Sequence, residues 1–119
     1  MLAAMDAAQA IADLTEISPQ VRTVAIVAAD GGVVGTNAAG EATERFAAGV
    51  RALVAAAEEL QPGVAQLEAA TAAGSVFVVR DGERLIAATT SPEPTVGLVF
   101  YDLKTCLRAA DEEPANAAA

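Results

Sequence analysis

The sequence predicts an α/β protein, a three-layer α/β/α sandwich around a five-stranded, mainly antiparallel sheet. Hydrophobic periodicity and turn residues give the order helix, two strands, helix, three strands, helix. Three of these strands are apolar at odd and even positions alike, so helices must cover both faces of the sheet. Tight turns join neighbouring strands, which favours antiparallel pairing. The 119 residues suffice for one domain, which we assign to residues 1–110.

The first third of the chain predicts a helix followed by a β-hairpin. Residues 2–17 repeat apolar side chains on one side at helical spacing, and the Ser-Pro that follows ends this helix. Residues 21–29 are rich in β-branched residues and apolar on both faces. The Asp-Gly-Gly at residues 30–32 predicts a tight turn, because glycine adopts positive φ readily. Residues 33–37 return as a short strand whose polar end indicates a sheet edge.

The longest helical pattern covers residues 42–60. Thr43 is the expected N-cap, because a hydroxyl can accept a hydrogen bond from a free N–H of the first turn. Glu44 adds a negative charge where the helix dipole favours one. A Pro-Gly at residues 62–63 ends the helix. The side expected to face the core carries Phe46, Val50, Leu53, Val54, Ala57 and Leu60.

The opposite side of this helix is a flat strip of small residues edged by charges. Solvent-facing helix surfaces usually carry more long polar side chains, so the strip suits close approach by another helix or a partner protein. Alanine is also a good helix former on any exposed face, which accounts for the strip equally well. The strip is our candidate partner-binding surface and consists of Glu44, Arg45, Ala48, Arg51, Ala52, Ala55 and Glu59.

Three further strands are predicted after this helix. Residues 64–72 alternate between polar and apolar side chains, which suits a less covered strand at a sheet edge. Residues 75–80 and 83–90 are apolar on both faces and therefore central. The Asp-Gly at residues 81–82 is the strongest two-residue hairpin signal in the chain and joins them.

A last helix is predicted over residues 95–110. We expect Tyr101 to be a partly buried ring and Asp102 to be an acid on the helix surface. Residues 111–119 have no periodicity and are predicted to be a disordered tail. The core stripe of the helix consists of Val96, Val99, Leu103, Cys106 and Leu107.

Charge and composition narrow the range of partners and locations. The formal net charge is −9, from 7 basic and 16 acidic residues. This balance argues against nucleic acid as a partner, because its phosphates need a basic face, and against binding to anionic membrane surfaces.

The sequence also indicates where the protein is located. No apolar run is long enough to span a bilayer, and the first residues lack the basic region of a secretory signal. The single cysteine cannot form an internal disulfide. We therefore expect a cytoplasmic protein.

Catalytic chemistry is not indicated by the side chains of this sequence. Histidine, the commonest general base and metal ligand, is missing. Cys106 is interpreted as a small core residue, because no histidine is available to activate it. The neighbouring acids Glu58 and Glu59 are interpreted as solvated charges. No phosphate-binding loop is present. We expect a non-enzymatic protein without cofactor or metal.

The ordered set of elements resembles the roadblock/LC7 domain family, over residues 8–108. The resemblance rests on VAIVAADGGVVG at residues 24–35, on SVFVVRDGERLIAATT at residues 75–90, and on TVGLVFYDLK at residues 95–104. These motifs are structural and only moderately specific one by one. Their combination in this order is more specific than any one of them.

The resemblance implies a particular sheet, a homodimer and a class of partner. The strand order would be second, first, fifth, fourth, third, with the long helix on one face and the two terminal helices on the other. Two subunits would pair through their third strands and set their long helices side by side. Family members commonly bind Ras-like small GTPases through the paired helices. The strand residues assigned to the dimer interface are Val64, Gln66, Leu67, Glu68 and Ala70.

Three functions remain open at this stage. The first is a homodimeric regulator or scaffold for a Ras-like small GTPase, because some bacterial family members stimulate hydrolysis by their GTPase and others are scaffolds. An assembly subunit without a GTPase partner is the second. The third is a small-molecule-sensing domain, against which stands a core poor in aromatic and convergent polar groups. Arg45 and Arg51 are the candidates for direct partner contact. An arginine can serve as a finger in a GTPase site, but a rim contact or a surface salt bridge is the simpler interpretation of both.

Overall fold

Three helices and one five-stranded sheet make up residues 6–110, the part of the chain that the computed structural model describes. The sheet has the order β2-β1-β5-β4-β3, and every neighbouring pair is antiparallel. This confirms the fold class and the strand order expected from the sequence and the resemblance. The elements are α1 (Ala7–Ile17), β1 (Val21–Val27), β2 (Val33–Thr36), α2 (Glu41–Leu60), β3 (Gln66–Thr71), β4 (Gly74–Asp81), β5 (Arg84–Thr90) and α3 (Val96–Ala109).

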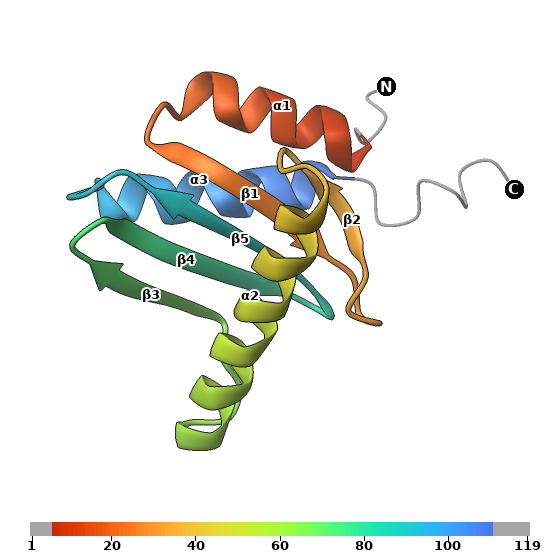
Figure 1. Cartoon of the computed structure of the whole chain (residues 1–119), viewed down its shortest axis with the longest axis vertical. Coiled ribbons are helices and arrows are strands. Elements are labelled where there is room, and N and C mark those ends of the chain that lie inside the picture. The colour runs from red at the N-terminus through yellow and green to blue at the C-terminus, as the bar shows by residue number, and fades with distance from the viewer. Residues whose placement is uncertain (1–5, 111–119) are drawn as a thin grey trace, which may run out of the picture.

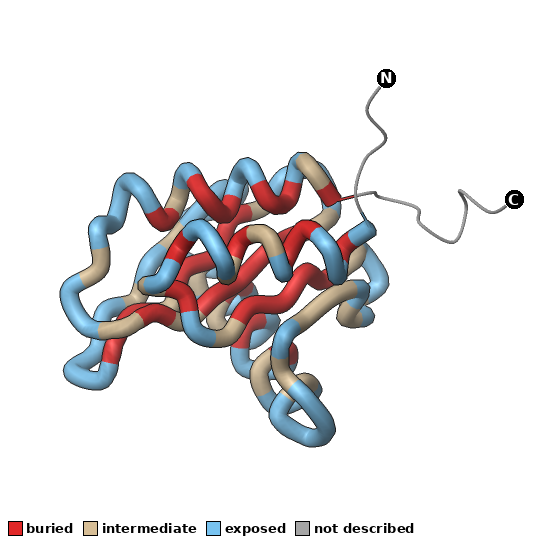
Figure 2. Tube along the Cα trace, turned by 90° about the horizontal axis from the view of Figure 1, so that it is seen from above, coloured by how far each residue is buried: buried red, intermediate tan, exposed pale blue. Residues whose placement is uncertain are grey.

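The helices lie on opposite faces of the sheet, with α1 and α3 on one face and α2 alone on the other (Figure 1). Side chains of the central strands alternate between the two sides. Phe77 and Ile86 contact α1 and α3 in the larger core cluster, whereas Val78 and Ala87 belong to the smaller cluster under α2. Buried residues concentrate in the strands and on the helix sides turned toward them (Figure 2). The central strands are therefore buried from both faces, as their apolar runs predict.

The β-hairpins form where the turn residues predict them. Asp30 Oδ1 accepts a hydrogen bond of 2.8 Å from Gly32 N, and Gly31 adopts a φ of +89° in the same turn. The β4–β5 turn places Gly82 at a φ of +67° between the paired residues Asp81 and Arg84. Glycine at these two positions avoids the steric cost that a Cβ would add at positive φ.

Helix α1 begins at Ala7, and its N-cap is Asp6, whose Oδ1 accepts a 2.8 Å hydrogen bond from Gln9 N. The helix was predicted over residues 2–17, and residues 2–5 lie outside the described part. The tail predicted at residues 111–119 lies outside it as well. None of the described helices is long and apolar enough to cross a membrane.

Helix α2 ends at Leu60 as predicted, but it differs from its prediction in its start and in the burial of its last residue. It begins at Glu41 with Gly40 as N-cap, so Thr43 is inside the helix and the prediction of a Thr43 cap is wrong. Its buried side carries Ala47, Val50 and Val54. Leu60 was assigned to the core face but is 85% exposed, because the last turns of α2 extend past the sheet (Figure 1).

Helix α3 buries most of its predicted stripe. Val99, Leu103, Cys106 and Leu107 are buried, but Val96 is 39% exposed in the first turn and does not belong to the core. At the other end, Arg84 of β5 donates from Nη2 to Leu107 O at 3.0 Å and from Nη1 to Ala110 O at 3.2 Å. These bonds satisfy carbonyls that the end of a helix leaves without partners.

Candidate functional site

The outward side of α2 is a continuous, exposed strip. All seven residues assigned to the partner-binding surface are exposed, as is Gly49, where a Cβ would meet no heavy atom within 4 Å. The floor of the strip therefore consists of alanine and glycine with nothing above it in the described chain. Small side chains let another helix approach closely, toward the lower end of the usual axis separation of about 8–10 Å. The exposed residues of the strip are Glu44, Arg45, Ala48, Arg51, Ala52, Ala55 and Glu59.

The two arginines of the strip differ in how firmly they are held. Arg51 Nη1 donates a 2.8 Å hydrogen bond to Gly31 O and so ties α2 to the β1–β2 turn. Arg45 makes an ion pair of 3.7 Å with Glu41, whose side chain is 94% exposed. Such an exposed pair contributes only about 0.3–0.5 kcal/mol. Arg45 is therefore free to meet a partner, whereas Arg51 would have to give up its bond to the turn.

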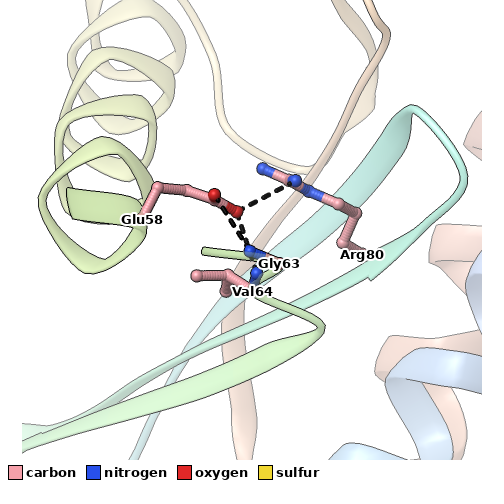
Figure 3. Close-up of polar contacts among 4 residues, drawn as sticks. All are labelled: Glu58, Gly63, Val64 and Arg80. Atoms are coloured by element: carbon pink, nitrogen blue, oxygen red, sulfur yellow. Dashed lines mark hydrogen bonds and ion pairs between the residues drawn. The ribbon is translucent and has the colours of Figure 1, made fainter. Parts of the chain in front are cut away.

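Glu58 joins the end of α2 to the start of β3 (Figure 3). Its carboxylate accepts hydrogen bonds from Val64 N at 2.8 Å, Gly63 N at 3.1 Å and Arg80 Nη1 at 3.2 Å. The bond from Val64, followed by those from Gly63 and Arg80, lowers the pKa of Glu58 below its ordinary value of 4.5. Glu58 is thus a structural acceptor, and its interpretation as a solvated charge is wrong. Glu59 is exposed, as expected.

Strand β3 is an edge strand, as its alternating pattern predicts. Arg80 N donates to Ala65 O at 2.8 Å, which fixes the hydrogen-bonding phase of the β3–β4 ladder. Odd-numbered residues of β3 therefore bond to β4, and the even-numbered residues direct their N–H and C=O groups to the open edge. These outward residues are Gln66, Glu68 and Ala70, three of the five residues assigned to the dimer interface.

The other two residues assigned to the dimer interface, Val64 and Leu67, do not direct their backbone groups to the open edge. Leu67 is half-buried in the cluster under α2, and Val64 precedes the strand, with its N–H held by Glu58. Both line a hollow of about 410 Å³ between the end of α2 and β3. Leu60 lines the same hollow. Gln66 lines this hollow too, so the hollow connects the end of α2 with the first outward residue of β3. Arg51 and Ala55 of the strip line a separate hollow beside the β1–β2 and β4–β5 turns.

Two kinds of reactive group are relevant to the α2 and β3 surfaces, a metal centre and a cysteine nucleophile. Within residues 6–110, no three His, Cys, Asp or Glu side chains gather closely enough to hold a metal ion. Cys106 is buried on the other side of the sheet, and burial raises the pKa of its thiol to about 11. A thiol with this pKa is not a ready nucleophile at neutral pH.

Two assignments on α3 are reversed by the structure. Tyr101, expected to be partly buried, is 65% exposed, and Asp102, expected on the surface, is only 8% exposed. Asp102 lies where α3 runs alongside α1, so its surroundings come from the first helix. Nothing in the sequence of α3 alone encodes that neighbour.

Sequence reasoning also missed Arg80 and the structural role of Glu58. The sequence offers one local signal for the role of Glu58: this acid lies five residues before Gly63, the glycine of the Pro-Gly that ends the helix. Arg80 follows the apolar run of β4, and an arginine at the end of a strand is commonly just an exposed charge without a specific partner. Its partnership with Glu58 depends on the α2–β3 connection and the β4 register together.

Comparison with known proteins identifies solved structures of the same architecture. No protein-family model and no curated protein matches the sequence. A roadblock/LC7 domain from Streptomyces avermitilis is 16% identical, with a TM-score of 0.71 over 87% of this chain and 93% of that chain. The gliding protein MglB from Thermus thermophilus is 16% identical, with a TM-score of 0.73 over 87% of this chain and 84% of that one.

A further MglB structure, described as having a tetrameric arrangement, is 15% identical with a TM-score of 0.74. That match covers 89% of this chain and 88% of the other. At these identities the similarity is one of fold, and it extends over nearly the whole length of the proteins compared.

Proposed function

Because this chain has the roadblock/LC7 fold, we propose that it is a homodimeric, non-enzymatic regulator or scaffold that binds a Ras-like small GTPase. The observation that carries the proposal is the presence of two unpartnered elements. The small-residue strip of α2 and the open edge of β3 both lack a partner in the described chain. They provide surfaces for a second subunit and for a further protein.

The open edge of β3 supports dimerisation. Gln66, Glu68 and Ala70 present their backbone groups outward, and the strand contains no proline that would block pairing. Two copies related by a two-fold axis would pair their β3 strands antiparallel and continue the sheet across the interface. The contact Glu58–Val64 fixes β3 relative to α2, so pairing of the strands would also bring the two α2 helices together.

The strip of α2 supports binding of a partner protein across the paired helices. Its centre, at Ala48, Ala52 and Ala55, consists of exposed small side chains, and its charged residues stand at the rim. Interfaces commonly combine a small or apolar centre with a polar rim. The expectation that this partner is a Ras-like GTPase comes from the roadblock/LC7 family, and several of the similar structures are MglB proteins.

Regulation of the GTPase would not require a catalytic group from this chain. Both arginines of the strip could in principle act as a finger, but Arg51 already bonds to Gly31 O, and Arg45 is held only by its exposed ion pair with Glu41. In this account, stimulation of hydrolysis acts by positioning loops of the GTPase, so Arg45→Ala and Arg51→Ala would both retain it. Loss of stimulation in either variant would show that the substituted arginine acts directly.

The proposal is tested by capture of partners from lysate of the source cells, once with GDP and once with a non-hydrolysable GTP analogue. We expect a small GTPase to be enriched by the wild-type chain. Enrichment in one nucleotide state would indicate a state-dependent regulator, and equal recovery would indicate a scaffold. Recovery of no GTPase in either state would contradict the proposal and favour the assembly-subunit function.

A further inference from the structure

A second surface lies on the opposite face of the sheet from α2. Helices α1 and α3 run side by side there and leave a groove of about 430 Å³ between them. Its floor is apolar and includes Leu14 and Cys106. Clefts between packed helices are common ligand and partner sites. The proposed α2 function does not use this groove.

Asp102 is the unusual feature of the groove. Its side chain belongs to the lining, and the residue is only 8% exposed. Within residues 6–110, no donor forms a hydrogen bond with its carboxylate and no basic side chain forms an ion pair with it. Its oxygens are accessible from the groove, because the buried side-chain atoms without a hydrogen-bond partner in the described chain are Ser18 Oγ and Arg84 Nε and do not include them. The groove therefore lacks a cationic group that Asp102 could meet.

The remaining charges of the groove have the same sign. Asp13 and Glu16 of α1 line it together with Asp102, and no lysine or arginine does. The two basic residues of α3 are directed elsewhere, since neither lines the groove and Arg108 pairs with Asp81 at 3.9 Å. The negative potential of the groove is thus not neutralised locally by the described chain, and a cationic ligand would be attracted.

The distribution of these acids argues against a metal ion. Among the described residues there is no group of three potential ligands close enough to bind one. An exposed apolar side chain also lines the groove, since Ile17 at its wall is 65% exposed. Leu98 does not line the groove but lies one turn before Asp102 on α3 and is 49% exposed. Exposed apolar residues around a charged groove are typical of a protein interface.

We propose that this groove binds a basic amphipathic helix of a partner protein. A lysine or arginine of that helix would meet Asp102, its other basic residues would face Asp13 and Glu16, and its apolar side would contact Leu14, Ile17 and Leu98. The aliphatic stem of a lysine or arginine can cross an apolar floor while its head reaches a carboxylate. A helix laid in a groove is a common mode of peptide recognition.

The two segments outside the described part do not carry the basic side chains that this helix needs. Residues 1–5 and 111–119, which lie outside the described part, contain no lysine or arginine. Residues 111–119 include three acidic residues, Asp111, Glu112 and Glu113, which Asp102 would repel. A partner that carries basic residues is therefore the occupant that the charges favour.

The test uses a display library of helical peptides selected on the full wild-type chain. The selected peptides are then measured by fluorescence anisotropy on three variants. Asp102→Asn removes the central carboxylate, and Thr105→Arg places a cation three residues away on the exposed wall of the groove. Glu83→Gln is the matched control, because it removes the same charge from an exposed residue on the α2 side of the sheet.

We expect selected peptides to be rich in lysine or arginine beside an apolar stripe. Their affinity should fall at least about tenfold on Asp102→Asn and Thr105→Arg and stay unchanged on Glu83→Gln. The proposal is overturned if no selected peptide depends on the groove, or if Glu83→Gln weakens binding as much as Asp102→Asn. A change of oligomeric state in Thr105→Arg would overturn it too, because a second copy would then be the occupant.

A stability measurement tests Asp102 independently of any peptide. Since its carboxylate has no partner in the described chain, Asp102→Asn should melt at the same temperature as the wild type or higher. A clearly lower melting temperature would mean that Asp102 has a structural partner within the protein. That result would contradict the proposal that the Asp102 carboxylate is available to bind a basic side chain of a partner.

Discussion

At the scale of single residues, Glu58 connects the two parts of the proposed interface. Its carboxylate holds Val64 N and Gly63 N, and it also pairs with Arg80 of β4. These contacts determine how β3 leaves the end of α2. A change at Glu58 should therefore affect both stability and the geometry on which dimerisation depends.

Glu58→Gln should lower the stability of the protein at neutral pH, because a neutral amide accepts weaker hydrogen bonds and loses the attraction to Arg80. The pKa of Glu58 is lowered by folding, so its contribution is complete above the ordinary value of 4.5. It is lost as pH falls through the lower folded value. Urea unfolding at a series of pH values measures the effect.

Glu59→Gln is the matched control for this measurement, since Glu59 is adjacent and exposed. We expect the urea midpoint of Glu58→Gln to be lower than that of the wild type at pH 7, and the two to converge in acid. Equal midpoints at pH 7 would show that the Glu58 contacts do not stabilise the fold.

Some residue environments could not be read from the sequence. Tyr101 and Asp102 are adjacent on α3 and differ by about 100° around the helix axis, so a modest rotation exchanges their exposure. The direction of that rotation depends on α1, which covers the Asp102 side. Cys106 was placed correctly because it belongs to the long apolar stripe that packs on the sheet.

At the scale of elements, the alternating direction of the backbone N–H groups along β3 allows the role of its open edge in dimerisation to be tested. The N–H of Glu68 points away from β4, whereas that of Ala69 belongs to the β3–β4 ladder. Glu68→Pro should therefore remove an outward donor and leave the β4 pairing in place. We expect this variant to remain folded and to become monomeric, as measured by analytical ultracentrifugation.

Ala69→Pro is the contrasting variant, because it removes a donor to β4. It should destabilise the fold itself, with a loss on the order of 3 kcal/mol. If Glu68→Pro remains a dimer with wild-type affinity, the dimer interface must lie elsewhere. Unfolding of Glu68→Pro would instead contradict the hydrogen-bonding phase described for β3.

The elements themselves were largely predictable from local patterns. Apolar runs on both faces identified β1, β4 and β5 as central, and alternation identified β3 as an edge. The failures occurred at helix ends. Thr43 satisfies the rule for a cap, but the chain enters α2 earlier through Gly40, and Leu60 lies beyond the sheet that would have buried it. Both depend on the path of the chain in space.

At the scale of the whole molecule, the two proposed surfaces lie on opposite sides of the sheet (Figure 1). The α2 strip and the groove between α1 and α3 share no residue. Binding at one should therefore not exclude binding at the other, which suits a scaffold. The net charge of −9 favours neutral or basic partner surfaces at both sites.

This arrangement predicts independent effects of two variants. Thr105→Arg should abolish binding of the basic peptide and leave capture of the GTPase unchanged. Ala52→Glu should have the opposite effect. Peptide anisotropy and GTPase capture, carried out on both variants, measure the two activities side by side. Loss of both activities in either variant would indicate that the surfaces are coupled or that the variant is misfolded.

The overall arrangement could be predicted only in part from residue patterns. Those patterns led to three layers and an antiparallel sheet, because apolar strands need cover on both faces. The strand order β2-β1-β5-β4-β3 came from the family resemblance, since no local pattern specifies that β5 lies between β1 and β4. The partner and its nucleotide state are properties of a second molecule, which this sequence does not encode.

The central claim is tested most directly by the affinity of the captured GTPase for purified Ala52→Glu. Ala52 is exposed at the centre of the strip, so a glutamate there should leave the fold intact and obstruct a close partner. We predict a Kd at least about tenfold weaker than that of the wild type, and no change for Ala12→Glu, the same substitution at an exposed site on α1. Equal affinity of the wild type and both folded variants would contradict a partner surface on α2.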